Sequence, residues 1–587
     1  MPSVATSLER TGSTAKVSGM PRRKPESTGA VYGIDLGTTY SCLAAIGASG
    51  KPEIVPQMDG ALTLPSVVLF VGADDYLTGE PARAQARALP DDVCTLAKRR
   101  MGDGEWRFVS HGKAWSAPAV SSLILRALIN NTALNTATAV HDVVITVPAY
   151  FGDEERRATR LAGEYAGLTV VDVISEPIAA ALSYGFARLD STSDDDAEEV
   201  ALVYDLGGGT FDVTVVELAE RRVAVVSIDG DHELGGADWD EKLAVHLARA
   251  FTAAHPDAED PLDDSLGSQA LILAAEKAKR ELTEATSTTV RVAHDGHEVE
   301  VPVSREEFEG LTRSLLDRTL ELTRQAVRAA RERGVRRIDR VLLVGGCSRM
   351  PAVAARLTEE LGVPTQLADP DLAVAKGAAI YGEKKSVERL VAGDLTTRGQ
   401  LLDGAPIGSA SPADLQAACA RLAEALGVTA DQVRRTIEVQ VLNVCSRGFG
   451  VMAVGMSGDL EAVFLVHRND RLPVAVRRSF GTMHDDQEVV TVRVIEQGGG
   501  AESTDAHLSK IIAEVSITEI PPGYPAGSQI EITLEMGFDG ILELTARHEG
   551  LADRPLKAQI ETSAALSQAD VARERAQVAR LRHGKPR

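Results

Sequence analysis

The sequence predicts a large α/β region, then an all-β region and one short C-terminal helix. From Val31 onward, short runs rich in Val, Ile and Leu end at Gly, Pro or Asp and alternate with helical stretches such as residues 153–166. After Val439, apolar and polar residues alternate as in half-buried strands, most clearly at residues 530–536. Residues 567–570 have the pattern of a helix cap and begin the final helix.

Composition limits the partners and the compartment. The 587 residues carry a formal net charge of −23, which repels phosphate backbones and anionic membranes, so we expect neither nucleic acid nor a membrane as partner. The 5 cysteines are scattered without a C-x-x-C pair, which favours a reducing compartment. Residues 1–29 are rich in Ser, Thr, Pro and basic residues and lack the apolar run of a secretory signal. We expect a disordered tail on a cytoplasmic protein.

Two motifs combine an Asp, one or more glycines and Thr at the end of a predicted strand. They are residues 33–40 and 204–212, each containing Asp-Leu-Gly. Backbone N–H groups at such turns can surround phosphate oxygens, and a carboxylate can hold a hydrated cation. The repetition predicts a duplicated fold whose halves face each other across a nucleotide. The sequence contains no Walker-type phosphate loop, and the second motif does not fit the dinucleotide fingerprint.

A helical pair is predicted between the α/β and all-β regions. Residues 385–410 are polar and contain several glycines, as in a linker. Ser411 then caps a helix that Gly427 can end, and Thr429 with Gln432 forms the capping pattern of a second helix.

Further motifs make the pattern specific to one family. Together with the two Asp-Leu-Gly turns, they resemble the heat shock protein 70 (DnaK-type) chaperone family and follow its order across residues 31–382. These motifs are residues 147–151, 176–181, 230–240, 276–280 and 344–351. The resemblance extends more loosely through residues 439–563.

The resemblance implies an actin-like, two-lobed ATPase domain followed by an all-β peptide-binding sandwich and a short C-terminal helix. The predicted parts are a disordered tail (1–29), a nucleotide-binding domain (30–384), a linker with a helical insertion (385–438), a β-sandwich substrate-binding domain (439–563) and a truncated lid helix with a tail (564–587).

By position in the family's motifs, ATP or ADP with Mg²⁺, and K⁺ as a further cation, would lie between the lobes. Lys98, Glu176, Asp212 and Thr38 would have catalytic roles, and Asp35 and Asp205 would hold the metal. The residues that would contact the phosphates or adenosine are Gly37, Thr38, Thr39, Tyr40, Gly208, Gly209, Thr210, Gly235, Gly236, Glu276, Lys279, Arg280, Thr283, Gly345, Gly346, Arg349 and Asp371. Hydrolysis of a phosphoanhydride needs in-line positioning and positive charge, which a lysine, a metal and a carboxylate can supply.

In the β-domain, aligning the strands with the family places six apolar residues along a groove for an extended peptide. They are Val451, Val454, Phe480, Met483, Val490 and Val492. Such a groove binds a backbone through hydrogen bonds and an aliphatic side chain in a pocket. Core packing is the alternative explanation for apolar residues at alternating strand positions.

Three departures from the family stand out. In the family an apolar linker docks on the ATPase lobes. Here residues 439–443 read Val-Gln-Val-Leu-Asn, and the polar Gln and Asn are expected to weaken that docking. Residues 385–438 have no evident counterpart. The lid is reduced to one helix near residues 568–582, so we expect fast peptide exchange.

The resemblance implies an ATP-dependent chaperone that binds extended hydrophobic segments of unfolded proteins and couples binding to ATP hydrolysis. A J-domain co-chaperone and a nucleotide exchange factor would be its partners. The alternative is a nucleotide-dependent regulatory protein of the same fold with one dedicated partner. A sugar kinase or filament protein is disfavoured by residues 176–181 and by the β-domain.

Overall fold

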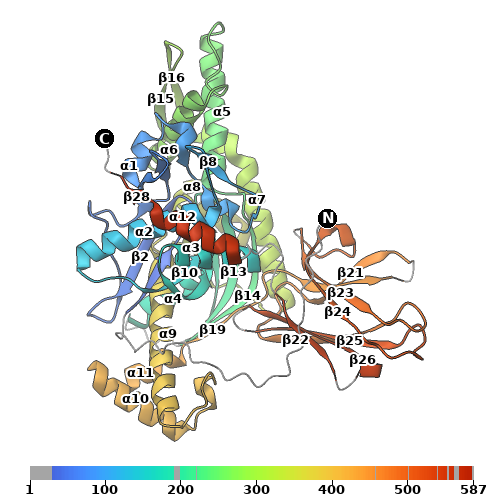
Figure 1. The fold of residues 1–587 in the computed structure, drawn as a ribbon. Helices are drawn as coiled ribbons and strands as arrows, with labels where there is room; N and C mark the ends of the chain where they lie inside the picture. Colours follow the sequence, from blue (N-terminus) through green and yellow to red (C-terminus); the bar gives the residue numbers. More distant parts are fainter. Residues whose placement is uncertain are drawn as a thin grey trace.

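Two sheets divide the α/β region into lobe I and lobe II, and a separate β-domain projects from their side (Figure 1). The computed structural model describes residues 30–190, 198–219, 221–455, 458–499, 501–537, 540–551, 554–560 and 568–584. The tail predicted at residues 1–29 lies outside these ranges. Among the helices of the described ranges, none is both long and apolar enough to cross a bilayer.

The main sheet of lobe I has the strand order β11-β10-β1-β2-β3, and β4 also pairs with β2. Strands β11, β10 and β1 are parallel, and β2 and β3 continue antiparallel. The strands are β1 (Val31–Asp35), β2 (Tyr40–Ile46), β3 (Pro52–Ile54), β4 (Leu64–Pro65), β10 (Asp142–Val147) and β11 (Thr169–Ser175). Helices α2 (Ala117–Thr136) and α3 (Asp153–Tyr165) contribute to the same apolar core.

Lobe II repeats this arrangement with the order β18-β17-β12-β13-β14. Again three parallel strands are followed by two antiparallel ones. The strands are β12 (Glu199–Leu206), β13 (Phe211–Ala219), β14 (Arg222–Asp231), β17 (Arg340–Val344) and β18 (Thr365–Leu367). The turns β1–β2 and β12–β13 carry the two Asp-Leu-Gly motifs, so the predicted duplication is confirmed.

Helices α4 (Glu176–Asp190) and α9 (Ala373–Thr397) join the lobes. They pack against each other, with α9 also on β1 and α4 also on β13. A Cβ on Gly377 would lie 1.7 Å from the carbonyl oxygen of Ala179, and one on Gly33 would lie 2.1 Å from the amide nitrogen of Ala379. Only glycine permits backbones to come this close. The crossing therefore fixes the separation of the two sheets.

The remaining elements of the lobes lie at their periphery. In lobe I they are α1 (Glu80–Gln85), β5 (Val68–Phe70), β6 (Asp75–Thr78), β7 (Val93–Cys94), β8 (Phe108–Ser110) and β9 (Lys113–Trp115). In lobe II they are α5 (Gly236–Ala254), α6 (Ser265–Glu284), α7 (Arg305–Glu332), α8 (Pro351–Leu361), β15 (Ser287–His294) and β16 (His297–Ser304).

The predicted linker at 385–410 is wrong for its first half, because α9 continues as a helix to Thr397. Apolar residues near the end of α9, including Val391 and Leu395, form a small core with the helical pair. The pair itself is confirmed. It consists of α10 (Pro412–Leu426), capped by Ser411 and followed by Gly427 with φ 70°, and α11 (Ala430–Glu438) with the predicted capping box.

The interdomain linker is docked as strand β19 (Gln440–Leu442), parallel to β14 at the edge of the lobe II sheet. The amide of Gln440 donates to the carbonyl of Arg221 at 2.7 Å. The side chains of Val439 and Val441 pack against the central core, whereas Gln440 is exposed. Because the Gln440 side chain points away from the core, its polarity costs the docked strand no apolar contact.

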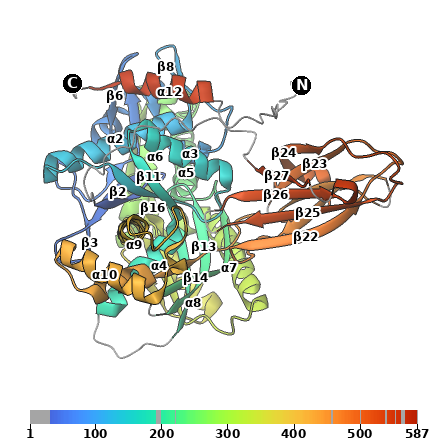
Figure 2. The same ribbon diagram turned by 60° about the horizontal axis from the view of Figure 1, so that its bottom comes forward.

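The β-domain is the predicted sandwich of two four-stranded sheets around one core (Figure 2). One sheet has the order β21-β20-β23-β24 and the other β22-β25-β26-β27. The strands are β20 (Phe449–Val454), β21 (Leu460–Val466), β22 (Val474–Gly481), β23 (Val490–Gln497), β24 (Ser509–Ile517), β25 (Gln529–Met536), β26 (Leu542–His548) and β27 (Leu556–Gln559).

The chain returns to lobe I after the β-domain. Helix α12 (Gln568–Arg580) lies across α2 and α3, and strand β28 (Arg582–His583) pairs with β6 (Figures 1 and 2). The sequence predicts a tail after the lid helix, and residues 582–584 there are bound to β6.

Charged residues line the contact of the β-domain with lobe I. Arg447 binds Glu155 at 3.0 Å and lies 3.6 Å from Glu496, whose side chain is only 2% exposed. Lys510 pairs with Glu154. Three carboxylates therefore share two cations. Burial raises the pKa of Glu496 to about 7; Arg447 opposes this shift, and Glu155 and Glu154 add to it.

We predict that the free energy of unfolding decreases as pH rises from 4.5 to about 7, the range over which Glu496 contributes. A carboxyl whose pKa is raised on folding stabilises the folded form fully below its unfolded value near 4.5, and the contribution is lost as pH rises to about 7. The change amounts to as much as about 3 kcal/mol. Thermal unfolding between pH 5 and 8 should therefore be less pH-dependent in Glu496→Gln than in the wild type. Equal pH dependence of the two proteins would contradict this assignment.

Candidate active site

A cavity of about 750 Å³ lies between the lobes, where the two Asp-Leu-Gly turns face each other. All but four of the predicted nucleotide-site residues line it. The other four are Gly209, Asp212, Gly235 and Gly236, which lie directly behind the lining. The structure therefore brings together residues that are up to 336 positions apart, from Asp35 to Asp371.

The two turns touch each other through their glycines. A Cβ on Gly208 would lie 2.2 Å from the Thr39 hydroxyl, and a Cβ on Gly209 would lie 2.2 Å from the Thr38 methyl group. Gly235 is packed as closely, since a Cβ there would lie 2.5 Å from the backbone of Gly209. Any side chain at these glycines would displace the turns, whose peptide N–H groups are of the kind that binds anions.

Lys98 and Glu176 form a buried ion pair on the floor of the cavity. Lys98 belongs to a 3₁₀ turn at Ala97–Arg100, and Glu176 begins α4. The next residue, Arg99, crosses from lobe I to lobe II, where it donates to the Gly209 carbonyl and to the Asp238 carboxylate, each at 2.6 Å. The turn with Lys98 is thus held to the β12–β13 Asp-Leu-Gly turn, the second of the two predicted phosphate turns.

Acidic groups outnumber the one lysine at this point. Burial raises the pKa of Asp35 to about 7, and the adjacent Glu176 adds to the shift. Burial, again with Glu176, holds the pKa values of Asp205 and Asp212 well above their usual range. Asp212 is fixed by the Ala149 amide, which donates to it at 2.8 Å. This excess of buried negative charge fits a site for a divalent cation.

The metal assignment remains a prediction for Asp35 and Asp205. Within the described ranges, no group of three or more His, Cys, Asp or Glu side chains is arranged to hold a metal ion by itself. A cation here would need water or phosphate oxygens to complete its ligands, as Mg²⁺ at nucleotide sites commonly does.

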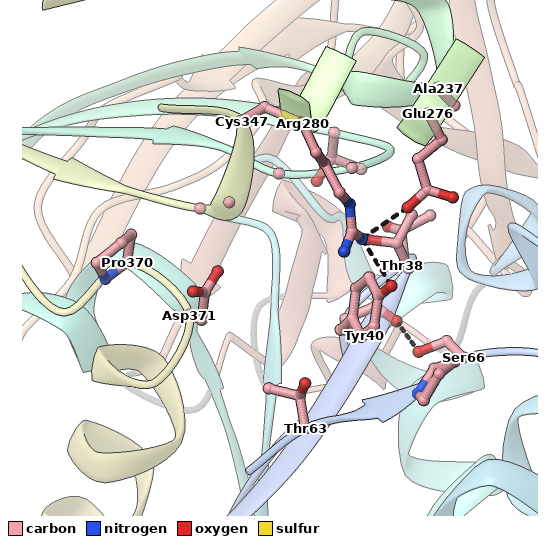
Figure 3. A pocket seen from close by; sticks show the side chains of 18 of the residues that line it. Thr38, Tyr40, Thr63, Ser66, Ala237, Glu276, Arg280, Cys347, Pro370 and Asp371 are labelled. Carbon is pink, nitrogen blue, oxygen red and sulfur yellow. Dashed lines mark hydrogen bonds and ion pairs between the residues drawn. The ribbon is translucent and has the colours of Figure 1, made fainter. Parts of the chain in front are cut away.

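At the outer end of the cavity, four side chains link the lobes. Three of them, Tyr40, Glu276 and Arg280, are labelled in Figure 3. Arg280 donates at 2.6 Å both to the Tyr40 hydroxyl and to Glu276. From lobe I, Arg83 donates to Tyr40 and to the second oxygen of Glu276, at 2.6 Å for the latter. Both guanidinium groups also face the Tyr40 ring. The distance to the ring centroid is 5.7 Å for Arg83 and 5.2 Å for Arg280.

Two residues of this end could not be identified from the sequence. Arg83 lies on the short helix α1, in no motif that marks a binding residue. Asp240 binds Lys279 at 2.7 Å, with both side chains buried, and its other oxygen has no partner among the described atoms. The motif at 230–240 contained Asp240, but its sequence did not show which acidic residue faces the cavity.

Other predicted residues of the outer end are also in place. Arg349 pairs with Asp371, and Gly345 and Gly346 line the cavity beside them. Cys347 lies close to Gly236, whose Cβ would be 2.3 Å from its sulfur. Burial raises the pKa of this thiol.

The six predicted peptide-binding residues of the β-domain differ in exposure. Val451 and Val492 lie in the sandwich core, and Phe480 and Val490 pack at its margin. Val454 and Met483 are 40% and 54% exposed. Val454 and Met483 are thus the most accessible to a ligand, Phe480 and Val490 are partly exposed, and Val451 and Val492 are buried beneath them.

A family model described as Hsp70 protein matches residues 31–396 and 420–583. The chain belongs to the Hsp70 family. Hsp70 proteins are ATP-binding chaperones with ATPase activity, and they generally bind unfolded polypeptides and co-chaperones. The match covers both lobes, the docked linker, the β-domain and α12. It omits residues 397–419, so the segment without a family counterpart is shorter than the predicted 385–438.

We predict that Gly235→Ala lowers ATP affinity at least about 100-fold, because the new methyl group would displace the second phosphate turn. Gly310→Ala on α7 is the matched control, since a Cβ there meets nothing within 4 Å. Isothermal titration with ATP checks both variants, and circular dichroism confirms that each is folded. Unchanged affinity in Gly235→Ala would show that the turn does not contact the phosphates.

Proposed function

We propose that this chain is an ATP-dependent molecular chaperone that hydrolyses ATP to ADP and phosphate and binds extended apolar segments of unfolded proteins. The observation that carries the proposal is the continuous connection between its two halves. The docked linker β19 pairs with β14, β14 pairs with β13, and β13 begins at the second phosphate turn. A shift of that turn is therefore transmitted to the strand that leads to the β-domain.

In this proposal, the chain's residues position ATP and water rather than form a covalent intermediate. The N–H groups of the two turns bind the phosphates, and Asp35 and Asp205 hold the cation. Lys98 places positive charge beside the transferred phosphoryl group, and Glu176 orients the attacking water. Bound Mg²⁺ supplies further positive charge to the phosphate oxygens. Thr38 and Asp212 complete the polar surroundings of the terminal phosphate.

At the other end, Glu276, Lys279, Arg280 and Thr283 hold adenosine. Arg83 is added to this group because it reaches Glu276 across the cleft and also binds Tyr40 of its own lobe. K⁺, a J-domain co-chaperone and a nucleotide exchange factor are part of the proposal through the family. The alternative, a regulatory protein with one dedicated partner, would keep the nucleotide site but not respond to general peptides.

Single-turnover hydrolysis of ATP tests the catalytic assignment. Lys98→Ala should slow hydrolysis by at least about 100-fold, because it removes the lysine charge beside the transferred group. The exposed neighbour Arg100 provides the control Arg100→Ala, which should retain the wild-type rate. Measured ATP binding separates loss of catalysis from loss of affinity. A normal rate in Lys98→Ala would refute the role given to Lys98.

The same assay with an extended apolar peptide tests the chaperone function. We expect peptide to accelerate hydrolysis in the wild type. Met483→Asp should abolish this acceleration without destabilising the fold, because Met483 is already 54% exposed. Leu508→Asp, at a 58% exposed position outside the predicted set, should leave it unchanged. Hydrolysis that ignores peptide in the wild type would favour the dedicated-partner alternative.

A further inference from the structure

The C-terminal strap, defined as residues 568–584, is built into lobe I. Val578 and Leu581 are 0% and 3% exposed and belong to the same apolar core as β1 and α2. Val571 packs at the margin of that core. The strap thus buries its apolar side chains in the lobe rather than against the β-domain.

Polar contacts fix the strap in one position. The Glu574 carboxylate accepts hydrogen bonds from Ser116 at 2.7 Å and from Tyr165 at 3.3 Å. Arg126 donates to the carbonyl of Val578 at 2.9 Å. These contacts involve both α2 and α3, so the helix is held along its length.

The end of the strap adds a strand to a sheet of lobe I. Arg582 and His583 pair in parallel with Asp75 and Tyr76. The Arg582 amide donates to the Asp74 carbonyl at 2.9 Å, and the Gly584 amide donates to the Tyr76 carbonyl at 2.7 Å. His583 also shares a hydrogen bond of 3.1 Å with the Thr78 hydroxyl. Backbone pairing of this kind fills an otherwise open sheet edge.

The β-domain is consequently attached to the lobes at both of its ends. Its first end leaves the docked strand β19 on lobe II, and its last strand, β27, is connected to the strap by residues 561–567. Eight Cα–Cα steps from Ile560 to Gln568 span at most about 28 Å. While the strap stays bound, the end of β27 must remain within that distance of α12.

Between its two attached ends, the β-domain also contacts both lobes directly. On lobe II, the Ile228 amide donates to Asn469 at 2.8 Å, and Arg468 binds Asp229 at 2.9 Å. On lobe I, Arg447 binds Glu155. Between two fixed ends, loss of these contacts allows the β-domain to swing but not to separate.

We propose that the C-terminal strap is a permanent part of lobe I, and that it keeps the β-domain beside the lobes whichever nucleotide is bound. If the strap moved away together with the β-domain, it would have to leave the core of lobe I. That movement would expose Val578 and Leu581 and open the sheet edge at β6. The inference goes beyond the proposed function and requires no hydrolysis.

The test is to cut the connection while leaving the strap in place. A protease recognition site is placed within residues 561–567 of the full-length protein, and the same site within 191–197 serves as control. Small-angle scattering then compares ATP- and ADP-loaded protein before and after cleavage. We expect the uncut protein to keep one radius of gyration with both nucleotides. The protein cut at 561–567 should expand with at least one of the two nucleotides, and the control cut should not change it.

Size-exclusion chromatography of the cut protein tests the permanence of the strap. The strap should co-elute with the lobes in ATP and in ADP. Val578→Asp should release it, whereas Ala579→Asp, at the exposed neighbouring position, should not. Release of the wild-type strap with either nucleotide would overturn the proposal. So would equal expansion of cut and uncut protein with either nucleotide.

Discussion

The crossing of α4 and α9 is the constraint on which the rest of the structure depends. At Gly377 the two helices meet backbone to backbone, and at Gly33 helix α9 lies directly on β1. These contacts set the distance between the two sheets and hence between the two phosphate turns, which touch through Gly208 and Gly209. A larger residue at the crossing would separate the lobes and widen the cavity between them, although neither Gly33 nor Gly377 lines that cavity.

Electrostatics at the base of that cavity follow from the same geometry. Bringing the turns together buries Asp35, Asp205 and Asp212 beside Glu176, with Lys98 as the cation paired to Glu176. Like charges in a poorly solvated space raise one another's pKa. The lobes therefore close around a charge imbalance that a nucleotide-bound cation would relieve, which ties lobe closure to ligand chemistry.

Local patterns predicted most of the fold. Strand alternation, the helix caps at Ser411 and Thr429 and the repeated Asp-Leu-Gly turns each depend on residues close in sequence, and the structure agrees with them. The family's motifs supplied the predicted nucleotide-site residues, most of which line one cavity. The sequence could not reveal Arg83, because its role arises only when α1 faces Glu276 across the cleft. It also could not reveal strand β28, whose two polar residues gain strand structure from the edge of β6. The end of α9 was missed because its apolar residues pack against the helical pair rather than against a lobe.

The position of β28 has a consequence for synthesis of the protein. Lobe I contains both the first described strand, β1, and the last, β28. From Tyr165, at the end of α3, to His583 the ribosome must add 418 residues. At about 5–20 residues per second this takes roughly 20–80 s. During that interval the edge of β6 and the apolar surface of α2 that later receives Val578 are exposed on the nascent chain. Lobe I is thus among the last parts of the protein to be completed. Until then, lobe I is itself a potential client of other chaperones.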